Sequence, residues 1–399
     1  MKVIIVGAGI GGLGAALALE KKGIQAEIFE AAPAIKAVGA GLWVAPNGLE
    51  ILKRIQPALK QAVIQAGWEL QASSVEDLHG HRLSGFNATD LRQRYGAGPL
   101  AIRRSALHEI LITGLKQTPL HTGKRFQAYE IVQDQVAVHF NDGSSATGDL
   151  LIGADGLRSR VRSQLFGEIP LRYSGQSCWR GLAPLRLPEP WYHKAQELWG
   201  DRPGLRAGFS QVNADEVYFY LTQCVPAGQL DRPEHLIPDL PKSSLLKSFA
   251  DFPERVLQII QATPHEAFLR NDLSDFVPLK SFGQGPVWLL GDSAHATTPN
   301  LGQGANQALE SAWALAESLS ECLADRLGQR SPPAPSDLEQ ALQNYQAKRL
   351  SRAHFITETS WKIGQISNLK RGLRLRNWLM AHLPERVVQH QLDQVFRLA

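Results

Sequence analysis

The sequence predicts an α/β fold with an inserted β-sheet and a C-terminal helical segment, and three observations support this prediction. Apolar strands run directly into turns rich in glycine and aspartate at Gly7, at Asp155 and at Asp292. Between the second and third turns, the rhythm of strands and helices gives way to residues that alternate between apolar and polar, as in strands with two different faces. Beyond the third turn the pattern is largely helical.

The first turn lies in a strand–turn–helix–strand unit. The strand at residues 2–6 leads without a gap into GAGIGG, a helical pattern follows, and a second strand covers residues 26–29. This order predicts a Rossmann-like dinucleotide-binding unit. We expect Gly7 to permit the sharp turn, Gly9 to let a pyrophosphate approach the backbone, and Gly12 to let the helix pack close to the strand.

Glu30 stands where the second strand ends. A carboxylate at this position can accept hydrogen bonds from both hydroxyl groups of an adenosine ribose. It would also repel a 2′-phosphate. The sequence therefore predicts that the bound nucleotide is FAD or NAD rather than NADP.

The second and third turns also end apolar strands, at residues 150–154 and 285–290. Asp155-Gly156 is also compatible with a plain turn in which Ser159 caps a helix. The third turn, GDSAHATTPNLGQGANQALESA, contains glycines at which a ligand could meet the backbone. Because ligands of open α/β sheets gather at the carboxyl ends of strands, we expect the three turns to converge on one elongated cofactor.

These three motifs, in this order, resemble the class A flavoprotein monooxygenases, the FAD-dependent aromatic hydroxylases. The resemblance runs from Met1 to about Arg352 and includes Tyr345-x-x-x-Arg349-x-x-Arg352. It is nearest to the single-component urate, salicylate and hydroxybenzoate hydroxylases and to the related epoxidases. It implies tight, non-covalent FAD, NADH or NADPH as co-substrate, and insertion of one oxygen atom of O2 into an aromatic or other electron-rich small molecule through a flavin C4a-hydroperoxide.

The resemblance also implies roles for individual residues. Arg104, rather than its neighbour Arg103, would lie near the pyrophosphate and ribityl chain, and the loop at residues 38–47 would follow the flavin. Pro299 would form a wall beside the reactive flavin carbon, and the helix that starts near Ala305 would point its amides at the pyrimidine edge of the ring. In full, the implied FAD-binding positions are Gly7, Gly9, Gly12, Glu30, Gly41, Arg104, Phe126, Asp155, Asp292, Gly302, Gly304, Ala305 and Asn306.

The alternating segment is expected to form the far wall of a substrate pocket. Arg206 and Tyr218 match positions that serve the substrate in the urate-hydroxylating branch, whereas Asn300 stands where that branch has an acid, so urate itself is in doubt. His295 is expected to be structural rather than catalytic. Further candidates for substrate contact are Trp179, Arg180 and Tyr220.

We therefore expect a discontinuous FAD-binding domain, formed by residues 1–172 and 280–325, and a β-sheet substrate domain at residues 173–279. A Pro-rich connector at 326–336 would lead to C-terminal helices at 337–399. From Tyr345 onward ten Lys or Arg oppose three Asp or Glu. These helices are expected either to pack on the body as a solvated face or to rest on a membrane that carries a lipophilic substrate.

The composition of the chain argues against several other classes of protein. A formal net charge of +4 does not indicate nucleic-acid binding, and three scattered cysteines fit neither a disulfide framework nor a zinc site. No apolar run reaches the roughly 18 residues of a membrane helix, and glycines break the N-terminal run, so we expect a cytoplasmic protein, monomeric or homodimeric. Three alternatives stay open: an epoxidase of an isoprenoid-type substrate, a flavin dehydrogenase without oxygen insertion, and a nucleotide sensor without turnover.

Overall fold

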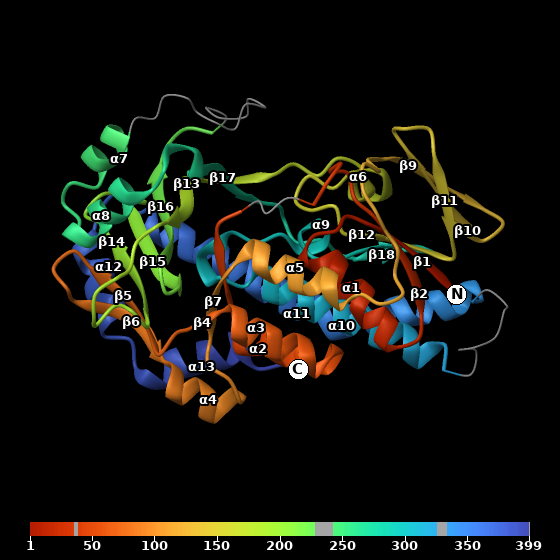
Figure 1. The fold of residues 1–399 in the computed structure, drawn as a ribbon, viewed down its shortest axis with the longest axis horizontal. Helices are drawn as coiled ribbons and strands as arrows, with labels where there is room; N and C mark the ends of the chain where they lie inside the picture. The colour runs from red at the N-terminus through yellow and green to blue at the C-terminus, as the bar shows by residue number, and fades with distance from the viewer. Residues whose placement is uncertain (36–38, 228–241, 325–332, 399) are drawn as a thin grey trace.

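The computed structural model describes residues 1–35, 39–227, 242–324 and 333–398. A parallel sheet near the N-terminus and a larger sheet at the opposite end share two long helices, α10 (Gly304–Cys322) and α11 (Pro335–Ser367), which run between them (Figure 1). The predicted fold class, an α/β protein with an inserted β-sheet and a C-terminal helical segment, is confirmed.

The parallel sheet is built on β1, whose residues Val3, Ile4 and Ile5 are completely buried. β1 pairs in parallel with β2 on one side and with β12 on the other, so their carboxyl ends, and the turns that follow them, meet at one edge. The edge strand β18 is the exception, because it pairs antiparallel with β19. In spatial order the strands are β18 (Gly283–Gln284), β19 (Val287–Leu289), β12 (Leu150–Gly153), β1 (Lys2–Val6), β2 (Gln25–Phe29) and β8 (Leu120–His121).

Helices cover this sheet and bury its aliphatic side chains in the main hydrophobic core. α1 packs on α10, and α10 packs in turn on α2 and α11. α1 presents a nearly continuous buried surface from Leu13 to Leu19, as expected for a helix inside a layered α/β domain. These helices, with their neighbours, are α1 (Ile10–Lys21), α2 (Pro46–Ile55), α3 (Pro57–Ala66), α5 (Arg104–Gly114), α6 (Arg160–Phe166) and α9 (Asp292–His295).

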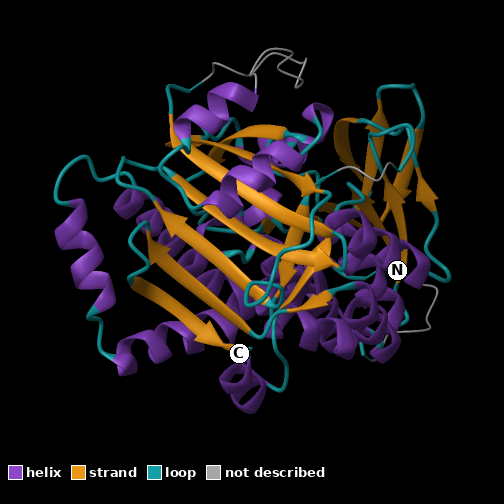
Figure 2. Cartoon of the chain, turned by 60° about the vertical axis from the view of Figure 1, so that its left-hand side comes forward, coloured by secondary structure: helices purple, strands orange, loops and turns teal. Residues whose placement is uncertain are grey.

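The larger sheet has seven strands, which lie side by side across the molecule (Figure 2). β16 alternates between buried and partly buried residues, as its sequence predicts, and all pairs are antiparallel except β14 with β5. A second core forms under helices α7 (Lys242–Ser248) and α8 (Glu254–Ala262). In spatial order the strands are β17 (Leu269–Asp275), β13 (Arg172–Ala183), β16 (Glu216–Cys224), β15 (Arg206–Asn213), β14 (Lys194–Trp199), β5 (Ala72–Asp77) and β6 (Arg82–Asn87).

The edge hairpin β5–β6 lies within residues 1–172, which we expected to belong wholly to the cofactor domain. The larger sheet therefore takes strands from both expected domains. The remaining strands of the described residues form two small sheets of three strands each. They contain β9 (Phe126–Val132), β10 (Gln135–Phe140) and β11 (Ser145–Gly148), and β3 (Gly41–Val44), β4 (Trp68–Glu69) and β7 (Leu100–Arg103).

The C-terminal segment is helical, as predicted, and it returns to the body of the protein. α12 (Leu373–Ala381) packs on β6, and the end of α13 (Glu385–Phe396) forms a small core with α4 (Ala88–Tyr95). Most of the expected connector, residues 326–332, lies outside the described residues. α11 begins at Pro335, two residues before the expected boundary, because proline is well suited to the first turn of a helix.

Candidate functional site

A cavity of about 1240 Å³ lies where the carboxyl ends of the parallel strands face the larger sheet. It exceeds the 300–1,000 Å³ or so of a typical small-molecule pocket, so it has room for a dinucleotide and a second small molecule. From the cofactor side it is lined by Gly9, Gly11, Gly41, Arg104, Gly291, Asp292, Pro299, Asn300, Gly302, Gly304 and Ala305. From the larger sheet it is lined by Cys178, Arg180, Glu197, Arg206, Tyr218, Tyr220 and Arg270, among others.

The glycines of the first turn are needed for different structural reasons. A Cβ on Gly12 would lie 2.0 Å from the carbonyl oxygen of Gly7, and a Cβ on Gly7 would lie 2.4 Å from that of Ala154. Gly7 also has a φ of 106°, which favours glycine. A Cβ on Gly9, in contrast, would meet no protein atom within 4 Å. Gly7 and Gly12 therefore serve the packing of strand and helix, whereas Gly9 borders open space in the cavity.

Two helices begin at this cavity without a side-chain cap. Gly9 precedes α1 and Gln303 precedes α10, and neither end has a capping hydrogen bond from a side chain. Gly302 has a φ of 61° and places no side chain between the cavity and the first turn of α10. The unpaired backbone N–H groups and the positive ends of two helix dipoles therefore face the same cavity, and both favour anionic groups.

Arg104 and Asp292 face the cavity from opposite segments. Both are accessible from the cavity yet surrounded by protein, so burial raises the pKa of the Asp292 carboxyl and lowers that of the Arg104 guanidinium. Each favours the charged form of the other. The neighbouring Arg103 instead pairs with Glu216 outside the cavity lining.

Glu30 lies beside the first turn, beyond the residues that line the cavity. Its two carboxylate oxygens accept backbone hydrogen bonds from Ala8 and from Ala32, each at 2.8 Å. These bonds fix the carboxylate at the end of β2 and leave lone pairs for further donors. Phe126 is buried in the core at the start of β9 and is likewise not part of the cavity lining.

Asp155 serves the start of α6. Its carboxylate accepts hydrogen bonds from the hydroxyl of Ser159 at 2.5 Å and from the backbone N–H groups of Arg160 and Val161. Burial raises its pKa, although these bonds favour the ionised form. Ser159 also caps α6 through the N–H of Arg162. This geometry corresponds to the plain-turn alternative considered for the Asp-Gly pair.

Two further predicted positions have packing roles. A Cβ on Gly41 would lie 2.6 Å from the Cβ of Tyr218, so the glycine allows β3 to pack closely against the Tyr218 side chain of β16. The side chain of Asn306 accepts the N–H of Ala45 at 3.0 Å and donates to the carbonyl of Trp43 at 3.3 Å. Asn306 thus joins α10 to β3 and to the residue before α2. The segment predicted as a loop, residues 38–47, contains this strand and the start of this helix, and its first residue, Val38, lies outside the described residues.

On the substrate side, Arg206 is buried within a polar cluster. Its guanidinium donates to Glu197 at 3.2 Å, to Gln176 at 3.2 Å and to Asn300 at 2.7 Å. Glu197 also accepts a hydrogen bond from the hydroxyl of Tyr220. The positive charge of Arg206 is therefore balanced at the cavity wall. Glu197 was not predicted from the sequence, where the only signal is a single acid within the mixed polar and apolar strand β14.

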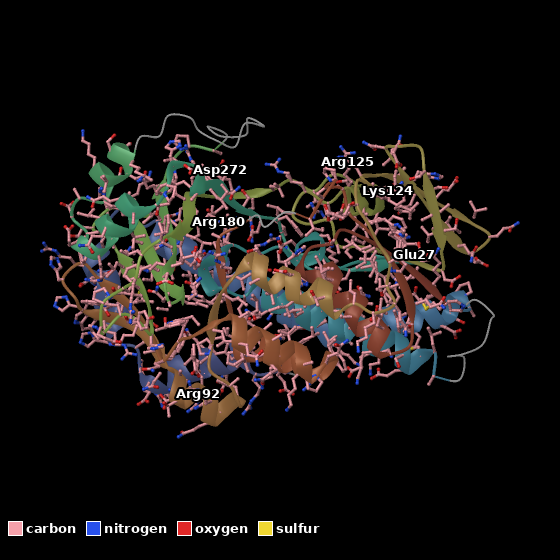
Figure 3. The ribbon with its side chains drawn as sticks, viewed as in Figure 1. Glu27, Arg92, Lys124, Arg125, Arg180 and Asp272 are labelled. Atoms are coloured by element: carbon pink, nitrogen blue, oxygen red, sulfur yellow. The ribbon has the colours of Figure 1, made fainter. Side chains whose placement is uncertain are left out.

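The other predicted substrate residues lie in different environments. Tyr218 lines the cavity, and burial raises its pKa, so its hydroxyl stays protonated. Arg180 also lines the cavity and donates to Asn271, which precedes Asp272 on the neighbouring strand β17; Figure 3 labels Arg180 and Asp272. Trp179 is buried under Arg270 and does not line the cavity.

His295 is buried behind the third turn and bonds to the hydroxyl of Ser311 at 2.8 Å. Burial, reinforced by Arg349, lowers its pKa to about 3, so the ring is neutral at physiological pH. It does not line the cavity. The Tyr345–Arg352 motif is also structural in this arrangement, because Arg349 and Arg352 both hold Glu310 of α10.

The cavity fits FAD. An open backbone at Gly9 and two uncapped helix ends suit a pyrophosphate and the anionic edge of a flavin. Asp292 inside the cavity, and Glu30 beside the first turn and outside the lining, offer acceptors for hydroxyl groups. These residues come from separate segments of the chain, and the carboxyl ends of the parallel strands bring them together.

Comparison with known proteins gives consistent results. The profile of the family described as FAD binding domain matches residues 1–360. The chain is 35% identical to the aurachin C monooxygenase/isomerase of Stigmatella aurantiaca, over 92% of this chain and 89% of the relative. It is 33% identical to the 2-heptyl-3-hydroxy-4(1H)-quinolone synthase of Pseudomonas aeruginosa, over 96% and 94%. The crystal structure of Klebsiella pneumoniae HpxO with FAD and uric acid superposes with a TM-score of 0.84 at 30% identity, over 99% and 96%.

Proposed function

The chain belongs to the FAD-binding family of flavoprotein monooxygenases, and on this basis we propose that it inserts one oxygen atom of O2 into an electron-rich aromatic compound that carries an apolar tail. When bound, FAD supplies the redox chemistry of such an enzyme, namely uptake of hydride from NADH or NADPH and activation of O2. The part of the protein is to hold the cofactor, orient the substrate and exclude water.

We assign the cofactor to the turns at the carboxyl ends of the parallel strands. Gly9 and the start of α1 would hold the pyrophosphate, with Arg104 close by, and Glu30 would hold the adenosine ribose. Asp292 would accept hydrogen bonds from the ribityl chain. The first turn of α10 would stabilise negative charge on the flavin by about 0.3–1 kcal/mol, or about 2 kcal/mol in a partly buried geometry.

The observation that carries the substrate class is the two-sided cavity wall. On the polar side, Glu197 neutralises Arg206, so Arg206 itself does not call for an anionic substrate. Arg206 and the hydroxyl of Tyr218 would orient a neutral ring through hydrogen bonds, with Pro299 on the cofactor side. Another part of the wall is apolar and is formed by β6, α11, α12, α13 and the turn between α12 and α13, with the side chains of Leu83, Phe86, Ile363, Ile366, Met380, Leu383, Val388, Leu392, Val395 and Phe396.

An alkyl-chain series tests this substrate class. We expect 2-heptyl-4-quinolone to accelerate NADH or NADPH oxidation by the FAD-loaded protein with a kcat/KM at least about tenfold above that of 2-methyl-4-quinolone, because each buried methylene contributes about 0.8 kcal/mol. With ¹⁸O2, the product should contain one labelled oxygen atom. Urate serves as the comparison for a small polar ring.

The outcomes separate the alternatives. Labelled epoxide from an isoprenoid-type compound, with no turnover of either quinolone, would identify an epoxidase that uses the same apolar wall. Product without labelled oxygen would indicate a dehydrogenase. Failure of every aromatic and isoprenoid compound to stimulate NADH or NADPH oxidation would favour a sensor and would overturn the proposal.

A further inference from the structure

The large exposed apolar side chains of the described residues are concentrated in one segment of the chain. Of the twelve large apolar side chains that are exposed in the described residues, seven lie between residues 366 and 387. We call these seven the α12 face, and they are Ile366, Leu369, Leu375, Trp378, Leu379, Leu383 and Val387. A soluble protein rarely exposes a continuous apolar patch without an interaction that covers it.

α12 is oriented with one of its two arginines, Arg376, inside and with several apolar residues outside. Arg376 is buried against the ring of Trp199, and Met380, one turn later, lines the cavity. Leu375, Trp378 and Leu379, at helical spacing on the other side, are 61%, 56% and 53% exposed. In water, a helix of this kind would be more stable with its apolar side chains turned toward the protein and its arginines turned toward the solvent. The observed orientation is therefore suited to an apolar environment outside the protein.

The segment of the chain that carries the α12 face is basic. Between residues 362 and 390 there are six Lys or Arg and a single acid, Glu385. Five of these six cations are exposed, namely Lys362, Lys370, Arg371, Arg374 and Arg386. Exposed apolar side chains on a short helix with flanking cations are typical of a segment that lies in the interface of an anionic membrane.

The α12 face also adjoins the cavity. A second cavity of about 480 Å³ lies between β6 and the helices α12 and α13. It shares Leu83, Phe86, Met380, Leu383, Val388 and Leu392 with the wall of the large cavity. Leu383 belongs to both the α12 face and the shared wall, so the apolar side chains common to the two cavities reach the surface at this residue.

We propose that the α12 face docks on an anionic lipid bilayer, with α12 lying in the headgroup region and the smaller cavity opening toward the acyl chains. This arrangement would deliver a lipophilic substrate from the bilayer to the proposed active site. Among the described helices, none is long and apolar enough to cross a membrane. The interaction we propose is peripheral, and bilayer binding itself does not depend on turnover or on the identity of the oxygenated compound.

Co-sedimentation of the FAD-loaded full chain with vesicles tests the proposal. We expect binding to vesicles of phosphatidylglycerol and phosphatidylcholine, weaker binding to phosphatidylcholine alone, and weakening by salt. Trp378→Ser combined with Leu379→Ser should reduce the partition coefficient by at least about tenfold, because two large apolar side chains no longer enter the interface. The matched control is Ile131→Ser with Val132→Ser, which removes two exposed apolar side chains from β9 at 54% and 49% exposure.

Three outcomes would overturn the proposal: no binding to anionic vesicles, equal loss of binding in the control, or a solution dimer that Trp378→Ser with Leu379→Ser converts to monomers. The dimer would identify a second copy of this chain as the occupant of the α12 face. Retained FAD absorbance shows that each variant is folded. Turnover of a water-soluble substrate without vesicles reports on the proposed function separately, so the two proposals can fail independently.

Discussion

Arg206 on β15 donates a hydrogen bond to the side-chain oxygen of Asn300 at 2.7 Å and so joins the larger sheet to the turn that contains Pro299. The amide nitrogen of Asn300 donates in turn to the hydroxyl of Thr298 at 3.0 Å and to the carbonyl of Ser360 at 2.9 Å. Asn300 therefore acts as acceptor and donor at once. A carboxylate at this position could accept from Arg206 but could not donate to Ser360.

We expect Asn300→Asp to be more damaging than Asn300→Ala. The aspartate would place an oxygen against the carbonyl of Ser360, at a cost of about 1–3 kcal/mol for the unsatisfied pair, and would displace the turn. Its kcat/KM should fall by about tenfold or more, and its Tm should fall below that of the alanine variant, while both bind FAD. Steady-state kinetics and thermal unfolding measure this. An aspartate variant with wild-type kcat/KM would show that donation by Asn300 is dispensable.

The first glycine turn offers a matched pair of substitutions. Gly12→Ala would place a Cβ 2.0 Å from the carbonyl oxygen of Gly7, so α1 must move away from the sheet and the protein should be unstable or insoluble. Gly9→Ala meets no protein atom within 4 Å, and Gly9 has an extended backbone that alanine tolerates. We therefore expect Gly9→Ala to fold but to lose FAD affinity by at least about tenfold, because its methyl group would enter the space proposed for the pyrophosphate.

Circular dichroism and fluorescence titration with FAD distinguish the two effects. If Gly9→Ala binds FAD as tightly as the wild type, the pyrophosphate does not lie against this turn. If Gly12→Ala folds normally, the close packing of α1 on β1 is not a constraint.

The strands and turns of the parallel sheet could be predicted because their signals are local. Residues 2–6 form β1 as predicted, and the apolar strands before Asp155 and Asp292 are present as β12 and β19. The contact between Glu197 and Arg206 could not be predicted, because it depends on the register of two strands that nothing in their sequence specifies. The orientation of α12 was also inaccessible, since its periodicity does not reveal which face meets the protein.

Removal of the carboxylate that joins α10 to α11 should strongly destabilise the helical layer. Although burial alone would raise the pKa of Glu310, Arg349 and Arg352 lower it, so the carboxylate is ionised. Glu310→Gln leaves two buried cations without a counter-charge and should cost about 3–5 kcal/mol of unfolding free energy. Urea unfolding measures this change.

Glu321→Gln is the matched control, because Glu321 pairs with Lys348 at 2.9 Å but is half exposed. Its loss should cost less than about 1 kcal/mol. Similar costs for the two substitutions would mean that the Glu310 cluster contributes no more than a surface pair.

His295 should make the protein less stable in mild acid. Burial lowers its pKa from 6.5 in the unfolded chain to about 3 in the folded protein, so the unfolded state binds a proton that the folded state refuses. The stability that this residue contributes is present above about pH 6.5 and is lost as the pH falls toward 3. Between pH 7.5 and pH 5 the loss should be about 2 kcal/mol, at about 1.4 kcal/mol for each unit of pH below 6.5.

His295→Asn should remove this part of the pH dependence, whereas substitution of the exposed His390 by Asn should leave it unchanged. Urea unfolding at the two pH values tests this, and an equal slope in His295→Asn and the wild type would show that another group is responsible.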